Sequence, residues 1–179
     1  MEHFPVFMNV SGRVILVCGE GKHAEEKLER LRPFDACVRW IPKGLGEEEL
    51  LKWDPVFVVT ASTPEENRRI AGLCRAHRIP VNAVDQRDSC DFYFPAMAVG
   101  RNYCAAICTD GKSPAVAAEL RARMEEQIPE DLDGILDWLQ SLRGRVDRKT
   151  LCNAARNAMD LGRPLTDGEL EKIVAESTK

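Results

Sequence analysis

The chain has 179 residues, of which 44% are hydrophobic and 30% charged, and its formal net charge is −4. This length and composition predict one medium domain, or one domain with a small helical appendage. The net negative charge excludes the strongly basic character of many nucleic-acid binders, so no nucleic-acid partner is expected. No apolar run approaches the roughly 18 residues of a membrane span, and the first five residues lack the basic start of a signal peptide, so no membrane association is expected.

The cysteine and histidine pattern gives no sign of a disulfide framework or a metal centre. Seven cysteines are scattered along the chain without a C-x-x-C pair, and the three histidines form no H-x-x-x-H or H-E-x-x-H spacing. Scattered thiols are typical of small core residues in a reducing compartment, which predicts a cytoplasmic protein. No resident metal is predicted, because paired ligand spacing is missing.

The first part of the chain alternates between strand-like and helix-like segments. In chain order they are a strand at 14–17, a helix at 23–31, a strand at 36–41, a short helix at 47–51, a strand at 56–60, a helix at 64–76, a strand at 81–84 and a strand at 103–108. Strands separated by helices predict βαβ units and a parallel sheet with right-handed crossovers.

From Ser113 onward the pattern is helical. Helices are expected at 115–127, 132–142, 149–160 and 167–176. The predicted architecture is therefore an α/β, Rossmann-like parallel-sheet domain at 1–112, followed by a small helical dimerisation and C-terminal region at 113–179. Val116, Leu120 and Met124 recur at helical spacing and predict a contact face in a two-fold homodimer. The alternative is a monomer in which this face packs on its own sheet.

A glycine-rich turn follows the first strand. Gly19, Gly21 and Ala24 have the G-x-G-x-x-G/A spacing of a dinucleotide-binding turn, in the predicted context of a strand before it and a helix after it. The helix start would present free N–H groups to a pyrophosphate. The alternative is an ordinary strand-to-helix turn. The predicted cofactor-binding residues are Gly19, Glu20, Gly21, Lys22, His23, Ala24, Thr60 and Ala61.

Four segments, which together span about residues 4 to 127, carry a resemblance to a known family. They are FPVFMNV at 4–10, VCGEGKHAEEK at 17–27, VNAVD with CDFYFPA at 81–85 and 90–96, and ICTDGKSPA at 107–115. Their order and content resemble the precorrin-2 dehydrogenase / sirohydrochlorin ferrochelatase family, a module that also begins the fused siroheme synthases. The resemblance implies a homodimer that oxidises the tetrapyrrole precorrin-2 to sirohydrochlorin with NAD⁺, and in some members inserts Fe²⁺ as a second substrate.

The resemblance also implies a catalytic residue. Asp85 stands at the position of the family aspartate at the end of VNAVD. A carboxylate there suits the chemistry, because oxidation of the macrocycle removes a proton together with a hydride, and metal insertion displaces pyrrole protons. The alternative is that Asp85 caps the turn after the strand.

The TDGKSP segment is the predicted substrate site, with Thr109, Gly111, Lys112 and Ser113 as its residues. It ends a predicted strand and begins a helix, so its hydroxyl and N–H groups are expected in the crevice at the carboxyl end of the sheet, where ligands bind in open α/β folds. Such groups suit a substrate with many carboxylates. The alternative for Ser113 is a plain helix N-cap before Pro114.

The chain departs from the family pattern at the nucleotide site. Glu20 and His23 replace a usual Gly and Val, and the stretch at 42–55 is shorter than usual. The second strand ends in Ile-Pro-Lys rather than an acid, which leaves NAD and NADP both open. Two alternatives to the dehydrogenase remain: a chelatase without redox activity, and a non-enzymatic module that carries a tetrapyrrole or a nucleotide.

Overall fold

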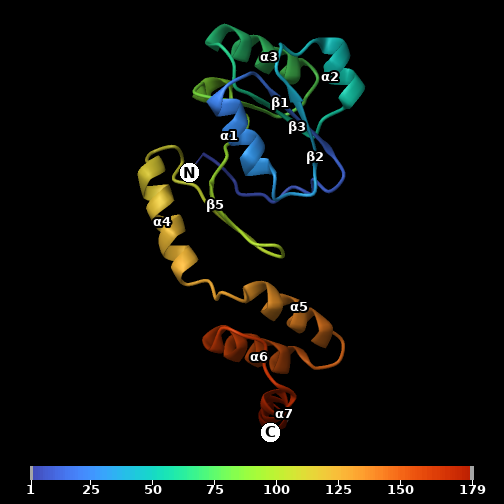
Figure 1. Cartoon of the computed structure of the whole chain (residues 1–179), viewed down its shortest axis with the longest axis vertical. Helices are drawn as coiled ribbons and strands as arrows, with labels where there is room; N and C mark the ends of the chain where they lie inside the picture. The colour runs from blue at the N-terminus through green and yellow to red at the C-terminus, as the bar shows by residue number, and fades with distance from the viewer. Residues whose placement is uncertain (1, 178–179) are drawn as a thin grey trace. The chain divides into compact units, whose positions relative to one another are not determined.

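The computed structural model describes residues 2–177 and divides into two units, one ending at Phe94 and the other beginning at Pro95 (Figure 1). The first unit is built on four parallel strands in the order β2-β1-β3-β4. Their bounds are β1 (Val14–Cys18), β2 (Cys37–Ile41), β3 (Phe57–Thr60) and β4 (Val81–Ala83). The four strands predicted in this part of the chain are confirmed to within one residue at each end, as is the parallel α/β fold.

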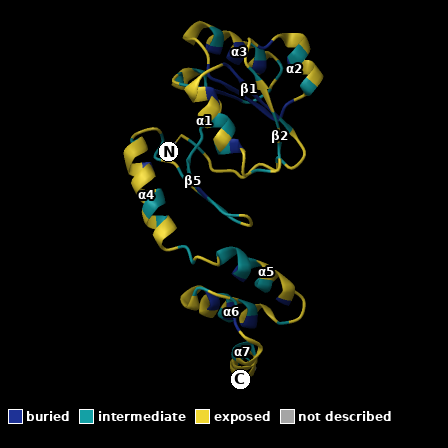
Figure 2. Ribbon diagram, in the orientation of Figure 1, coloured by how far each residue is buried: buried dark blue, intermediate teal, exposed yellow. Residues whose placement is uncertain are grey.

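Helices cover both faces of this sheet. Alternate residues of β1 point to opposite sides: Ile15 and Val17 pack beside α1 (Lys22–Leu31), and Leu16 packs beside α2 (Glu47–Trp53) and α3 (Pro64–Ala76). Because both faces are covered, the central strands β1 and β3 are apolar apart from the buried Thr60 at the end of β3, as is typical of parallel sheets. Figure 2 shows these strands in the buried colour.

Two of the buried positions are cysteines. Cys18 on β1 and Cys74 on α3 are fully buried in the same apolar cluster, and burial raises the pKa of both thiols to about 12. The other five cysteines are less buried, and Cys37, Cys108 and Cys152 are exposed, so the prediction that the thiols serve as small core residues holds for Cys18 and Cys74 but not for these three. Among residues 2–177, no helix has the length and apolar character needed to cross a membrane.

The second unit begins with a hairpin that corrects one prediction. β5 (Ala96–Val99) pairs antiparallel with β6 (Cys104–Ile107) in a sheet of its own. The strand predicted at 103–108 therefore exists, but its assignment to the parallel sheet was wrong. Only residues 100–103 join β5 to β6, and a parallel connection between two strands needs about a dozen residues or more, so this pair can only run antiparallel. The connection is a tight turn in which the Gly100 N–H donates to Tyr103 O at 3.0 Å.

Four helices complete the second unit. They are α4 (Pro114–Glu126), α5 (Leu132–Leu142), α6 (Arg148–Leu161) and α7 (Asp167–Ser177), each within one residue of its predicted bounds. α4 packs on the hairpin, and α5, α6 and α7 share a small core around Ile135 and Ala154. The hairpin turn is tied to α5, because the N–H groups of Arg101 and Asn102 donate to the Asp133 carboxylate at 3.0 and 2.6 Å. The division at Phe94 falls earlier in the chain than the predicted boundary after residue 112.

Candidate active site at the carboxyl ends of the parallel strands

A hollow of about 750 Å³ opens in the first unit where the parallel strands end. Its walls come from the segments that follow β1, β2, β3 and β4 and from the first turns of α1 and α3. The lining residues are Glu20, His23, Pro42, Ala61, Ser62, Thr63, Pro64, Asn67, Arg68, Val84, Asp85 and Gln86. Four of the predicted site residues (Glu20, His23, Ala61 and Asp85) are thus brought together from three separate stretches of sequence.

The three small residues of the glycine turn have different structural roles. A Cβ atom on Gly19 would lie 2.6 Å from the carbonyl carbon of Ala61, so only glycine lets the ends of β1 and β3 approach this closely. Gly21 has φ 80° and ψ −169°, a backbone region open almost only to glycine, and the space beside its Cα is empty within 4 Å. Ala24 is fully buried against Ile15 and Val17, which lets α1 pack closely on the sheet.

His23, in the first turn of α1, and Glu20, just before the helix, line the hollow, whereas four other predicted residues of the same turn are not among its lining residues: Gly19, Gly21, Lys22 and Ala24. Gly21 is the N-cap, and within the described residues no side chain caps this helix. The uncapped N–H groups and the positive end of the helix dipole form a site suited to an anion. The Lys22 side chain is exposed, and its Nζ lies 3.8 Å from Glu26 Oε1, one turn further along the helix. The ammonium group is therefore paired with Glu26 and is not fixed at the helix start.

Asn67 was not singled out from the sequence, yet it shapes the floor of the hollow. Its side chain is 2% exposed, its Oδ1 accepts from the Thr60 hydroxyl at 2.7 Å and from Ser62 N–H at 2.9 Å, and its Nδ2 donates to Val84 O at 3.2 Å. One amide therefore ties the ends of β3 and β4 to α3. Thr60 is fully buried in this contact, so it supports the site from behind. The sequence signal was a polar residue on the face of α3 that also carries Ile70.

Asp85 lines the hollow and is the second residue after the end of β4. Its backbone is left-handed, with φ 59°, a conformation uncommon for residues other than glycine but tolerated by aspartate. The side chain is exposed and lines the hollow with Val84 and Gln86. Within residues 2–177 no side chain caps the 3₁₀ turn η1 (Arg87–Ser89) that follows. Asp85 itself lies in the turn that the bond from Gln86 N–H to Ala83 O closes at 3.2 Å, so the structural alternative for this residue stays open beside the catalytic one.

Gln86 is a second residue that the sequence did not reveal. Its Nε2 donates to Pro64 O at 2.8 Å, while its Oε1 is buried and has no hydrogen-bond partner among the described residues. A buried acceptor without a donor costs stability unless a ligand or water supplies one. Because Gln86 lines the hollow, this oxygen is available to a ligand's N–H or O–H group.

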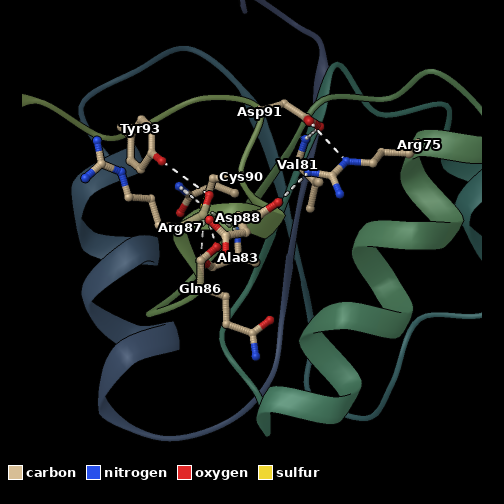
Figure 3. Close-up of polar contacts among 10 residues, drawn as sticks. Arg75, Val81, Ala83, Gln86, Arg87, Asp88, Cys90, Asp91 and Tyr93 are labelled. Atoms are coloured by element: carbon tan, nitrogen blue, oxygen red, sulfur yellow. Dashed lines mark hydrogen bonds and ion pairs between the residues drawn. The ribbon is translucent and has the colours of Figure 1, made fainter. Parts of the chain in front are cut away.

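The segment after η1 returns to β4 and fastens the loop that carries Asp85 (Figure 3). Cys90 contacts the backbone of Ala83, and Asp91 contacts the backbone of Val81 and the guanidinium of Arg75. The Tyr93 hydroxyl donates to Arg87 O at 3.3 Å. The base of the loop is therefore held by side chains that follow it in the sequence.

The predicted substrate residues lie in the second unit, in the turn between β6 and α4. The sequence had suggested that these residues follow a strand of the parallel sheet. That placement was wrong, because β6 belongs to the separate two-stranded sheet. Ser113 is the N-cap of α4, accepting from Val116 N–H at 3.2 Å, as its alternative interpretation proposed. Thr109 Oγ1 donates to Ser113 O at 3.0 Å and accepts from Ser113 N–H at 3.3 Å. Gly111 has φ 72°, and the Lys112 N–H donates to Thr109 O.

Comparison with known proteins agrees with this geometry. A protein-family model described as "Putative NAD(P)-binding" matches residues 6–96, about half of the chain. A siroheme synthase of Neisseria meningitidis is 30% identical over 173 residues, which is 84% of this chain and 36% of the relative. A siroheme synthase of Thioalkalivibrio sulfidiphilus is 33% identical over 151 residues, or 72% of this chain and 30% of the relative.

A solved structure shares the fold. The protein named "SirC, precorrin-2 dehydrogenase" superposes with a TM-score of 0.71 and 18% identity, over 97% of this chain and 98% of the other. The chain spans about a third of the length of the curated siroheme synthases that it matches. These findings confirm the resemblance read from the four sequence segments, and the chain belongs to the NAD(P)-binding family that matches residues 6–96.

Proposed function

We propose that this protein catalyses the NAD-dependent oxidation of precorrin-2 to sirohydrochlorin, a step of siroheme biosynthesis. The observation that carries the proposal is a single hollow lined both by His23, in the uncapped first turn of α1, and by Asp85. The similarity to siroheme synthases and to a precorrin-2 dehydrogenase supports the choice of substrate.

The residues present fit a dinucleotide. The empty space beside Gly21 leaves room for a pyrophosphate at the start of α1, where free N–H groups can donate to it. The unpaired Gln86 Oε1 offers an acceptor to a hydroxyl or amide of the same ligand. Glu20 and His23 line the hollow without closing it, so the two departures from the family pattern leave the site open.

In this proposal Asp85 handles the proton. Bound NAD⁺ supplies the acceptor for the hydride. Asp85, which lines the hollow, accepts the proton that leaves the macrocycle or orients the carbon from which it leaves. The same carboxylate is placed to receive pyrrole protons if Fe²⁺ is inserted in a later step, with Fe²⁺ as a substrate rather than a resident ion.

We assign substrate contacts in the second unit to Thr109, Gly111, Lys112 and Ser113. Lys112 is exposed and carries a positive charge, and the turn lies at the N-terminus of α4, where anionic groups are favoured. Carboxylates of a tetrapyrrole match this chemistry. The Thr109 hydroxyl holds the turn in shape through its hydrogen bonds with the backbone O and N–H of Ser113.

We further propose a cytoplasmic homodimer formed through α4. Val116 and Leu120 are 51% and 44% exposed, whereas Met124 is half-buried, so two of the three residues of the stripe predicted from the sequence are exposed. The buried residue of α4 is the small Ala117. The larger side chains of Val116 and Leu120 are therefore available for contact with a second copy of the chain. The seven free thiols suit a reducing compartment.

A staged anaerobic assay tests the proposal. Precorrin-2 is incubated with the protein and NAD⁺ while the absorption spectrum is recorded, and Fe²⁺ is added afterwards. The proposal predicts NADH and sirohydrochlorin in the first stage. A chelatase without redox activity would give no NADH but would insert Fe²⁺ into added sirohydrochlorin, and a carrier module would do neither.

A further inference from the structure

β4 is the last strand of the parallel sheet, and its outer edge is closed without a further strand. Its inner edge pairs with β3, as in the bond from Val84 N–H to Thr60 O at 2.8 Å. The outward backbone groups belong to Val81 and Ala83. An open strand edge leaves its polar groups unpaired and invites wrong pairing, so proteins cover such edges.

Asp91 occupies the first outward position of β4. Its Oδ2 accepts from Val81 N–H at 3.0 Å, and its own N–H donates to Val81 O at 2.8 Å. The second oxygen, Oδ1, accepts from Arg75 Nε at 3.2 Å. One residue thus satisfies both backbone groups of Val81 and anchors the segment to α3.

Cys90 occupies the second outward position. Its Sγ accepts from Ala83 N–H at 3.2 Å and lies 3.1 Å from Ala83 O, to which the thiol donates. A second acceptor, Gln86 O, lies 3.4 Å from the same sulfur. Burial raises the pKa of this thiol, which keeps it protonated and able to donate.

Together, Cys90 and Asp91 on the backbone of Ala83 and Val81 form what we call the edge clamp (Figure 3). The clamp closes a short loop, residues 84–89, at its base. Asp85 is the second residue of this loop, and its left-handed backbone persists only if its neighbours fix it. The sulfur reaches the carbonyl of Gln86, the residue next to Asp85.

We propose that Cys90 is a positioning residue, which holds the 84–89 loop through Ala83 and Gln86 and thereby sets the place of the Asp85 carboxylate. The inference rests on the proposed function for the task of Asp85. It predicts that loss of the thiol lowers turnover while nucleotide binding at the start of α1 continues. Misplacement of a reacting group by about 1 Å can cost up to a hundredfold in rate.

The test compares three variants. Cys90→Ala removes the sulfur, and Cys90→Ser restores a group that both donates and accepts. Cys74→Ala removes a buried thiol from a core cluster of the same sheet that contains no residue of the 84–89 loop. We expect Cys90→Ala to lower kcat for precorrin-2 by about tenfold or more, with the Kd for NAD⁺ unchanged within error. Cys90→Ser should recover most of kcat, and Cys74→Ala should lower only Tm.

A second measurement is independent of turnover. The Gln86 N–H donates to Ala83 O at the base of the loop, at 3.2 Å, and the Ser89 N–H donates to Gln86 O within the loop, at 3.0 Å. Their amide hydrogen exchange should accelerate in Cys90→Ala but not in Cys74→Ala. If kcat and exchange change no more in Cys90→Ala than in Cys74→Ala, Cys90 does not position the loop. If the wild-type protein shows no turnover, the proposed function fails, and the exchange result alone decides the clamp.

Discussion

Gly19 packs against the carbonyl group of Ala61 so closely that no side chain fits between them. A Cβ atom at position 19 would be 2.6 Å from the Ala61 carbonyl carbon and closer still to its oxygen. The ends of β1 and β3 are joined here by the bond from Ala61 N–H to Cys18 O at 2.8 Å. The first glycine of the turn is therefore required by the sheet, whatever binds beside it.

Gly19→Ala should destabilise the first unit. The methyl group must push the end of β3 away, and overpacking of this kind costs about 1–3 kcal/mol. Urea unfolding should show a lower midpoint than wild type. A midpoint equal to that of wild type would mean that the two strand ends separate without cost.

Gly21→Ala should weaken NAD⁺ binding more than it weakens the fold. The new methyl group enters the empty space where we place the pyrophosphate, and the positive φ adds backbone strain. Gly12→Ala is the matched control, because Gly12 also has a positive φ of 66° and empty space beside it, but precedes β1 instead of capping α1. Calorimetric titration should show weaker binding for Gly21→Ala alone; equal loss in both variants would assign the effect to strain.

Asp85→Asn keeps the shape of the side chain and removes its charge. If Asp85 accepts or orients the proton, turnover of precorrin-2 should fall about a hundredfold or more, as is typical for lost acid–base groups. Tm should change little, because the side chain is exposed. Asp88→Asn, three residues further along the same loop, is the control that should retain activity. Full activity in Asp85→Asn would move the site elsewhere.

Leu120→Glu should split the proposed homodimer. A charge in the centre of an apolar contact face is costly to bury, and Leu120 lies on the exposed face of α4. Light scattering should give the dimer mass for wild type and the monomer mass for the variant. Leu51→Glu changes an exposed leucine on α2 and should keep the dimer mass. A monomeric wild type at micromolar concentration contradicts the proposal.

Glu169 should make the stability of the helical region pH-dependent. Hydrogen bonds from Arg163, and then from Thr166, lower the pKa of Glu169 from 4.5 to about 2. A pKa lowered by folding adds stability that is complete above the unfolded pKa of about 4.5 and is lost as the pH falls toward 2. The difference in Tm between wild type and Glu169→Gln should therefore shrink over this range. Glu171→Gln, on the same helix, should show no such trend.

The sequence predicted the regular elements well where apolar periodicity and end signals agreed. The helix of α3 was predicted to the residue, since Pro64 sits in its first turn after the Thr63 cap and Ile70 and Cys74 share its buried face. The start of α7 followed from the spacing of Thr166 and Glu169, whose carboxylate accepts from the Thr166 N–H at 2.8 Å as a capping box does.

Apolar periodicity and helix-end signals did not predict the contacts between residues that are distant in the sequence. β5 follows a proline and is only partly buried, so its short run carries little apolar signal, and its pairing with β6 depends on the turn at 100–103. The bridges made by Asn67 and Cys90 depend on which backbone groups reach them in space. The sequence placed Asp85 at a strand end but gave no information on the clamp that holds its loop.

The most direct test of the account measures NADH formed per sirohydrochlorin produced when the wild-type protein is incubated with precorrin-2 and NAD⁺. Hydride transfer to a dinucleotide in the hollow predicts equal amounts of the two products, and loss of both in Asp85→Asn. Sirohydrochlorin that forms without NADH, or a substrate spectrum that does not change with NAD⁺, would contradict it.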